Sequence, residues 1–367
     1  MTTNRYRKPG MAGPHGARGV SLIELMIAML LGLVVVAAAG GLFLTNKRVY
    51  ASTETLNRIQ ENTRSSFEIM SRDVREAGGR VCGSSSQLVN MLRSSNSAWW
   101  ASFREGVHGY DGTTSAPGTA TGTAAAQRVS GTDAIDLHMA NEGGHAIVQH
   151  DTPSATLDLD STSGLANNDI VMACNTSYSV IFQVTNLNGT GVVHNGGAGA
   201  PGNCGQELQF ENPDLSKCSG ASAVHGYCMM GNTSAQCVKS STEPAVLVKA
   251  GTVRWYIGYN GRNGGTSLYR ANVTNRTTGA TPDIVDPVEI AEGISDMQLE
   301  YRSLGAATFE SASSVTDWSL VNAVRINLTA QGAEGALRGS YIEGTDGDAL
   351  SREVTHVVAI RNREGVL

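Results

Sequence analysis

The sequence predicts an α+β protein in which a long N-terminal α-helix packs on an antiparallel β-sheet head with long, disulfide-bearing loops. Residues 25–44 carry no charge, and a helical pattern of apolar residues continues from there to about residue 77. The rest of the chain alternates short apolar runs with stretches rich in Gly and Ser. With 367 residues, the chain is long enough to bury a sizeable core.

Charge is distributed unevenly along the chain. The formal net charge is −6, which gives no global basic surface of the kind that binds nucleic acid. Residues 1–19 contain four basic residues and no acid, which leaves 23 basic against 33 acidic residues in the rest of the chain. These four residues are Arg5, Arg7, Lys8 and Arg18.

The charge-free run at residues 25–44 is long enough to cross a membrane. As a helix rising about 1.5 Å per residue, it spans roughly 30 Å. The basic leader favours a cytoplasmic N-terminus, so the bulk of the protein should lie outside the cytoplasm. A secretory signal peptide cut at residues 37–39 and a plain anchor are alternatives. Neither explains Glu24, because a carboxylate at the edge of a spanning segment costs about 1–3 kcal/mol.

The residues around Glu24 carry a family resemblance. Residues 19–26 read GVSLIELM, and Glu24 is fifth when counted from Val20. This resembles the class III leader junction of type IV pilins and type II secretion pseudopilins. The resemblance implies that residues 1–19 are a leader peptide and that an inner-membrane prepilin peptidase cuts between Gly19 and Val20. It also implies N-methylation of Val20, although most members have Phe or Met at this position.

Glu24 has a physical role if the apolar helices of many subunits pack in parallel. Its carboxylate and the N-terminal amine of a neighbouring subunit would then be the charges in the packed centre. Their pairing offsets desolvation, whereas a broken buried pair costs about 3–5 kcal/mol. We therefore predict that Glu24 sets subunit register and that residues 20–44 form the transmembrane and filament-core half of the helix.

The helical pattern continues through residues 45–79. Apolar and small residues recur there at spacings of three and four, with charged residues between them. This stripe consists of Leu56, Ile59, Thr63, Phe67, Met70, Val74 and Ala77. We expect one helix from residue 20 to about 77, whose second half packs on the head. Gly78 and Gly79 supply a helix stop.

Residues 80–367 are predicted to form a β-rich head that is periplasmic or extracellular. Predicted strands are Ala134–Ala140, Asp169–Cys174, Val180–Thr185, Ala245–Lys249, Val253–Tyr259, Leu268–Val273, Met297–Tyr301, Val321–Thr329 and Val354–Arg361. Asn260–Gly265 is predicted to join two of them as a hairpin. One face of the antiparallel sheet should rest on the amphipathic half of the helix.

Two segments interrupt the strand pattern. Residues 112–126 contain only Gly, Thr, Ser, Ala and Pro, which predicts a flexible surface loop that buries little. Residues 186–244 are rich in Gly, Asn and Ser and hold four cysteines. We interpret them as an exposed, Cys- and Gly-rich insertion on the head.

All six cysteines follow the membrane segment, and an even number in an exported chain favours disulfides. They are Cys82, Cys174, Cys204, Cys218, Cys228 and Cys237. The sequence leaves the connectivity open, and our prediction pairs Cys82 with Cys174 and the other four among themselves. Close C-x-x-C pairs are absent from the sequence, so we expect no metal site there, and no cofactor.

Patterns for catalysis are weak. The G-x-G-x-x-G match at residues 197–202 contains a proline, and no helical pattern follows it. His145 and His150, beside Glu142 and Asp151, indicate a polar turn rather than a metal site. We therefore expect that the chain is not an enzyme.

Length and C-terminal patches narrow the resemblance. The 348 residues that follow residue 19 exceed the length of major pilins and most pseudopilins, so the chain resembles a large minor pilin. The most specific similarity is to PilW-type type IV pilus assembly proteins. Its patches are Arg75–Gly78 ahead of Cys82, Glu292–Tyr301, Trp318 with Ala323–Ile326, and Val358–Asn362.

This resemblance implies a function in assembly. Such a subunit joins other minor pilins in a priming complex on the inner-membrane assembly platform and starts polymerisation of the major pilin. It is expected at the inner membrane as a single-pass protein with a periplasmic head, and then at the pilus tip on the cell surface, with a large tip adhesin as a further partner. Twitching motility and adhesion would depend on it.

Three other functions remain open at the sequence level. A J-type minor pseudopilin of type II secretion would share the leader and the priming role. A tip adhesin or DNA-uptake pilin would use residues 186–244, although this segment has only Lys217 and Lys239 as basic residues. An exported soluble enzyme would require cleavage after the apolar run.

Overall fold

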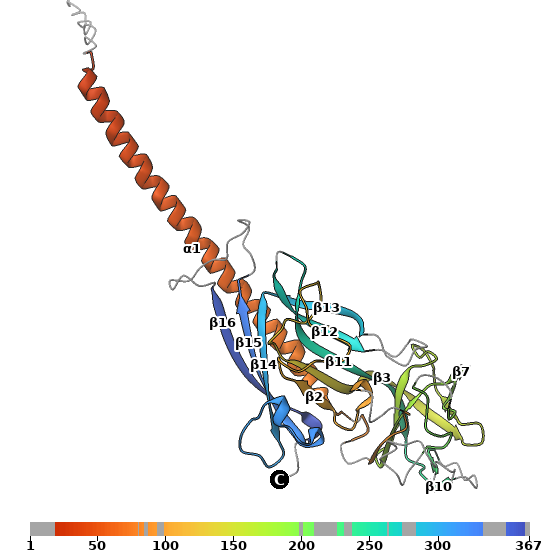
Figure 1. Ribbon diagram of the computed structural model, residues 1–367. Helices are drawn as coiled ribbons and strands as arrows, with labels where there is room; N and C mark the ends of the chain where they lie inside the picture. Colours follow the sequence, from red (N-terminus) through yellow and green to blue (C-terminus); the bar gives the residue numbers. More distant parts are fainter. Residues whose placement is uncertain are drawn as a thin grey trace, which may run out of the picture. The chain divides into compact units, whose positions relative to one another are not determined.

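The computed structural model describes residues 19–79, 81–83, 87–93, 99–197, 201–208, 226–230, 237–262, 264–273, 284–332 and 350–363. The chain divides into two units, residues 1–54 and 55–367. One helix, α1 (Leu22–Glu76), contributes to both units, and the strands belong to the second (Figure 1).

Helix α1 is continuous over 55 residues. Ser21 caps its start, because the Glu24 backbone N–H donates to Ser21 Oγ at 3.2 Å. The helix ends where Gly78 adopts a φ of 65° and its N–H donates to the His138 carbonyl at 2.8 Å. The predicted single helix and its glycine stop are confirmed.

The described part of the head contains a large sheet of eleven strands. Its main order is β1-β6-β5-β11-β3-β4-β8-β7, with β12 and β13 following from β11 and with β2 paired to β3. Every pair in it is antiparallel except β1 with β6. The strands are β1 (Gln87–Asn90), β2 (Val107–Tyr110), β3 (Ala134–Asp151), β4 (Thr156–Leu159), β5 (Ile170–Cys174), β6 (Tyr178–Gln183), β7 (Asn186–Asn188), β8 (Gly191–Val193), β11 (Ala245–Tyr259), β12 (Thr266–Val273) and β13 (Ile284–Glu292).

A second, three-stranded antiparallel sheet has the order β14-β15-β16. Its strands are β14 (Ile294–Ser303), β15 (Val321–Gln331) and β16 (Ser351–Ala359), and a separate parallel pair joins β9 (Gly226–Cys228) to β10 (Cys237–Ser240). Short 3₁₀ turns are η1 (Trp99–Ala101), η2 (Ala312–Ser314), η3 (Trp318–Leu320) and η4 (Arg361–Arg363).

Each predicted strand overlaps a strand of the structure, but the predicted strands Ala245–Lys249 and Val253–Tyr259 are one continuous strand, β11, and the last predicted strand ends at Ala359 rather than Arg361. The hairpin at Asn260–Gly265 joins β11 to β12, and the Asn260 N–H donates to the Gly265 carbonyl at 2.9 Å. The predicted polar turn around His145 and His150 is wrong. Strand β3 continues through it with a bulge before Gly144, because the segment pairs with β11 on one side and β4 on the other.

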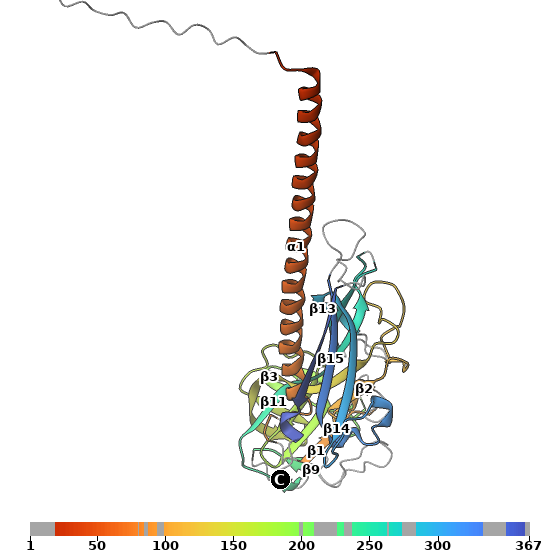
Figure 2. The same ribbon diagram turned by 90° about the vertical axis from the view of Figure 1, so that its left-hand side faces the viewer.

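The first core forms where α1 packs with both sheets. From residue 55 onward, the helix buries Ile59, Phe67, Met70 and Val74, and Ala77 directly after it, against side chains of β3, β11, β14 and β15. Figures 1 and 2 both show the three-stranded sheet alongside this part of α1. The predicted stripe is confirmed, with Leu56 at its margin as a 37% exposed residue.

A second core lies at the other end of β3 and β11. Four of its fully buried residues come from the segment 186–244: Val192, Leu208, Tyr227 and Met229. The expectation that this segment is exposed is therefore wrong at these four residues, whereas other described residues of it, such as Asn186 and Asn188, are exposed. The apolar residues of this segment are too widely spaced to show a strand pattern in the sequence, yet they pack against the sheet.

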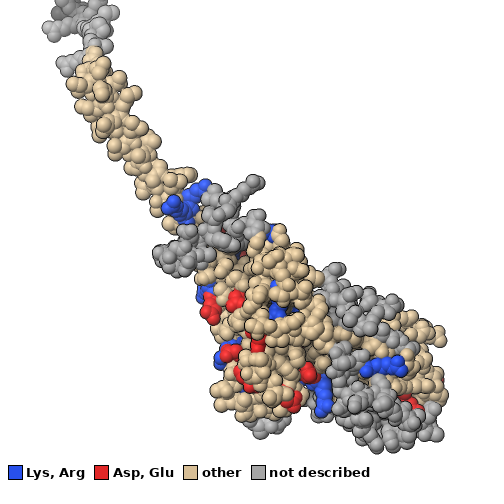
Figure 3. All heavy atoms as spheres, viewed as in Figure 1, with Lys and Arg blue, Asp and Glu red and all other residues tan. Residues whose placement is uncertain are grey.

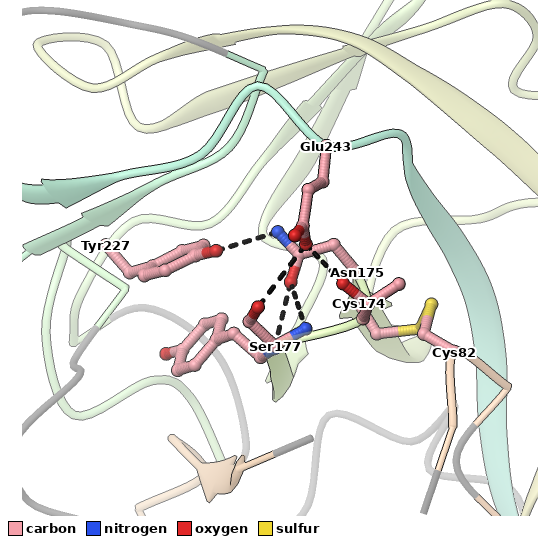
Figure 4. The surroundings of a disulfide bond; sticks show 8 residues. Cys82, Cys174, Asn175, Ser177, Tyr227 and Glu243 are labelled. Atoms are coloured by element: carbon pink, nitrogen blue, oxygen red, sulfur yellow. Dashed lines mark hydrogen bonds between the residues drawn. A yellow bond between two sulfur atoms is a disulfide. The ribbon is translucent and has the colours of Figure 1, made fainter. Parts of the chain in front are cut away.

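A disulfide lies in a third buried cluster, which includes Leu92, Trp100, Met172 and Cys174. Cys82 and Cys174 form a disulfide, which confirms that predicted pair (Figure 4). Beside it, Asn175 donates to the Tyr227 hydroxyl at 2.7 Å. Cys204 and Cys228 are also disulfide-bonded, whereas Cys218 and the side chain of Cys237 lie outside the described residues.

Most of the loop at residues 112–126 is exposed, but its centre is tied to strand β11. Ala116 is fully buried, and the Arg254 guanidinium donates to the Pro117 carbonyl and to Thr119 Oγ1. Arg254 also forms a completely buried ion pair with Asp136. The expectation that this loop buries little is therefore confirmed, and the few contacts at its centre satisfy donors that a buried arginine cannot leave unpaired.

Candidate functional site: the apolar stem and its anchor

The predicted cleavage junction lies just outside helix α1. Gly19 and Val20 precede the Ser21 cap, and both are exposed. A Cβ atom added at Gly19 would meet no heavy atom within 4 Å. The peptide bond between these residues is therefore accessible and is not held in helical hydrogen bonding.

Glu24 lies in the first turn of α1, with its side chain exposed. A carboxylate at this position interacts favourably with the helix dipole, typically by about 0.3–1 kcal/mol. Within the described part of the chain, no ion pair involves Glu24.

The surface of the stem is apolar on all sides. Every Leu, Ile, Val, Met and Phe side chain between residues 25 and 44 is more than half exposed. Figure 3 shows an uninterrupted tan surface along this helix until blue side chains appear beyond it. Within the described residues, α1 is the one helix long and apolar enough to cross a membrane. Such a surface requires lipid or other apolar helices around it.

Asp73 anchors the second half of α1 to the large sheet. Its carboxylate accepts a hydrogen bond from Trp255 Nε1 at 2.9 Å and another from Arg270 Nε at 2.7 Å. The Asp73 side chain is 9% exposed and that of Arg270 is 26% exposed. Sequence reasoning missed this site, because an acid in the amphipathic half looks like one of many solvated charges.

Arg363 holds the end of α1 to the C-terminal part of the head. Its guanidinium donates to the carbonyls of Trp318, at 2.6 Å, and Val321, at 3.1 Å. It also lies against Gly78, where a Cβ atom would stand 3.3 Å from Arg363 Nε. The sequence patches that carry the family resemblance are therefore close together in the structure, because the end of the helix, Trp318 and the β14–β16 sheet pack in one core.

Comparisons with family models match both ends of this arrangement. Residues 14–40 match the model described as "Prokaryotic N-terminal methylation motif", and residues 254–362 match "Type IV Pilus-assembly protein W". In these two regions the chain is similar to type IV pilus-assembly protein W and to proteins with the N-terminal methylation motif. No curated protein and no solved structure matches it.

The two matches fall on different structural parts of the chain. The methylation motif includes Gly19, Val20 and Glu24, and the PilW region runs from the end of β11 through β16. The latter supplies most of the surface on which α1 packs. Together the two matches support a type IV pilus-related minor pilin.

The histidines singled out in the sequence do not form a common site. His145 contacts Asp160 at 3.8 Å and the Ser163 carbonyl at 3.0 Å, whereas His150 is buried beside His194. Burial lowers the pKa of His150 to about 4 and that of His194 to about 3. Within the described ranges, no group of three His, Cys, Asp or Glu residues is placed to hold a metal ion.

Proposed function

We propose that this PilW-type pilin primes type IV pilus assembly at the inner membrane and then occupies the pilus tip, where it supports twitching motility and adhesion. The observation that carries the proposal is the composition of α1. One uninterrupted helix is apolar on every side in its first half and is anchored in a folded head through its second half. Such a helix transfers from lipid to a bundle of similar helices without exposing polar backbone.

In this proposal, prepilin peptidase cuts the accessible bond between Gly19 and Val20 and methylates the amine of Val20. The stem, residues 20–44, remains in the inner membrane with the head in the periplasm. Glu24 then pairs with the N-terminal amine of a neighbouring subunit and sets its register. The neighbours are other minor pilins and the major pilin, gathered on the assembly platform, with a large adhesin as a further partner at the tip.

Substitution of Glu24 tests the register step. The variant Glu24→Ala should be cleaved and methylated normally, yet cells that carry it should fail to assemble surface pili. Glu61→Ala is the matched control, since Glu61 is an exposed acid on the same helix and should leave piliation unchanged. Wild-type piliation in Glu24→Ala would sink the register argument.

Two further measurements separate the alternatives. Mass spectrometry of the mature chain should find N-methylated Val20, whereas an N-terminus near residue 40 would indicate secretory processing and a soluble product. Deletion of the gene should abolish pili and twitching while secretion of exported enzymes continues. Normal pili with lost secretion would instead assign the chain to a type II secretion system.

A further inference from the structure

The three-stranded sheet has one covered edge and one open edge. At the β14 edge, Asp133 takes the place of a strand, because its N–H donates to the Met297 carbonyl and its carboxylate accepts from the Leu299 N–H at 2.7 Å. At the other edge, β16 pairs with β15 and with no other described strand.

The register of β16 shows which backbone groups face the open edge. The Ile360 N–H donates to the Asn322 carbonyl at 2.8 Å, so these residues form a hydrogen-bonded pair. In an antiparallel ladder every second residue exchanges such bonds. Residues 354, 356 and 358 therefore bond to β15. Thr355 and Val357 direct their N–H and C=O groups outward.

β16 also lacks the features that usually protect an edge strand. β13, whose second edge is likewise unpaired within the described residues, contains Pro287 and two irregularities of register. In contrast, β16 has no proline, keeps an unbroken register with β15, and carries no Asp, Glu, Lys or Arg from Val354 to Ala359. Its backbone is therefore suited to pair with another strand.

A groove of about 550 Å³ lies beside this edge, between α1 and β16. Phe67 and His356 form part of its wall, with ring centroids 4.2 Å apart, and Val354 adds apolar surface. A groove next to an unpaired strand can receive the inward side chains of an added strand.

The charges that line the groove are predominantly positive. Arg64 and Arg75 reach it from α1 and Arg352 from β16, whereas Glu68 is the one acid in its lining. The nearby Glu76 is paired with Arg72 at 3.2 Å. An occupant with carboxylates is therefore complementary to this surface, and a basic occupant is repelled.

We propose that β16 and its groove bind an extended acidic segment of a neighbouring subunit, which adds a fourth strand to the β14–β16 sheet. Backbone bonds to Thr355 and Val357 would hold the segment, and its carboxylates would lie toward Arg64, Arg75 and Arg352. The inference rests on the proposed assembly function only for the identity of the chain that supplies this segment.

Peptide binding to the full-length protein in detergent tests the charge preference. The probes are two labelled nonapeptides, one alternating Val with Glu and one alternating Val with Lys. The acidic peptide should bind at least tenfold more tightly, and less tightly as salt is raised. The variant Arg64→Glu/Arg352→Glu should lose at least tenfold, while Arg104→Glu, at an exposed arginine outside the groove, should not. Equal binding of both peptides would overturn the proposal.

Two measurements test strand addition itself. Val357→Pro removes an outward N–H without touching the β15 ladder and should weaken the acidic peptide at least tenfold, whereas Val357→Ala keeps the N–H and should stay within twofold. In the wild-type protein, the peptide should slow hydrogen exchange at the amides of residues 355 and 357. Unchanged exchange there would exclude backbone pairing, even if the proline variant failed to fold.

Other occupants give different outcomes. Dimerisation of the protein alone, broken by Val357→Pro, would show that a second copy occupies the edge and would overturn the proposal. The protein could instead bind phosphatidylglycerol vesicles in a way that depends on these arginines and is not competed by the acidic peptide. That result would show that lipid occupies the surface and would also overturn the proposal. Because peptide binding requires no pili, its failure is distinguishable from failure of the proposed assembly function, which Glu24→Ala reports.

Discussion

Removal of the charge on Asp73 tests how the stem helix is held in the head. Asp73→Asn preserves side-chain size and leaves an oxygen that can still accept from Trp255 Nε1. It removes the negative charge that faces the Arg270 guanidinium at 2.7 Å. The substitution therefore isolates the ionic part of the anchor.

The expected loss is about 2 kcal/mol. Breaking a buried ion pair costs about 3–5 kcal/mol, and a hydrogen bond to a charged group contributes about 1.5–3 kcal/mol. The range for a hydrogen bond to a charged group applies here, because the Arg270 side chain is 26% exposed and can be solvated by water once its partner loses its charge. Asp73 also lies in the last turn of α1, where removal of a negative charge recovers about 0.3–1 kcal/mol from the helix dipole.

Urea unfolding of the full-length protein in detergent, followed by circular dichroism, measures this loss. Glu61→Gln on the same helix is the matched control and should change the free energy of unfolding by less than about 0.5 kcal/mol. A cycle with Arg270→Gln should give a coupling of about 1–3 kcal/mol between the two positions. A loss in Asp73→Asn no larger than in the control, or zero coupling, would refute the anchor.

Three further predictions concern the head. Replacing Cys82 and Cys174 together by Ser should lower the free energy of unfolding by about 2–5 kcal/mol in the same urea assay, and an unchanged midpoint would contradict a stabilising role for this bridge. Tyr301→Phe should be neutral or stabilising by about 1 kcal/mol, because the Tyr301 hydroxyl is buried with no partner among the described residues; a clear loss would reveal a missing partner. The free energy of unfolding should be constant above about pH 6.5 and should fall toward pH 4 by about 1.4 kcal/mol per pH unit for each buried neutral histidine. The reason is that burial lowers the pKa values of these histidines in the folded state, so the unfolded chain takes up protons first as the pH falls. Asp133, whose pKa burial raises to about 6, offsets one of them, and urea titrations at pH 7, 6 and 5 would reject this account if the profile were flat. The histidines are His138 and His150, with pKa values of about 4, and His194, with a value of about 3.

The features that could be predicted from the sequence are those written in short-range patterns. The charge-free run and the three- and four-residue spacing specify α1 without reference to any distant residue. Alternation specifies β11 and β15 in the same way, and the Asn260–Gly265 turn follows from local composition. The junction around Glu24 is likewise contained in eight consecutive residues.

The anchor could not be predicted, because it depends on residues that are distant in the sequence. Asp73 meets Trp255 and Arg270 across 182 and 197 positions. Local rules even disfavour an acid near the end of a helix. Asp73 is unfavourable by this local rule, but its contacts with Trp255 and Arg270 compensate. Such a conflict between a local preference and the native residue therefore marks a site that holds the helix and the sheet together.

The second core shows a different limit of sequence reasoning. Composition indicated loops for residues 186–244, yet the segment supplies Val192 and Tyr227 to a buried cluster. Strands β3 and β11 run through both cores, so the second core needs only a few apolar residues and cross-links to complete a sheet that already exists.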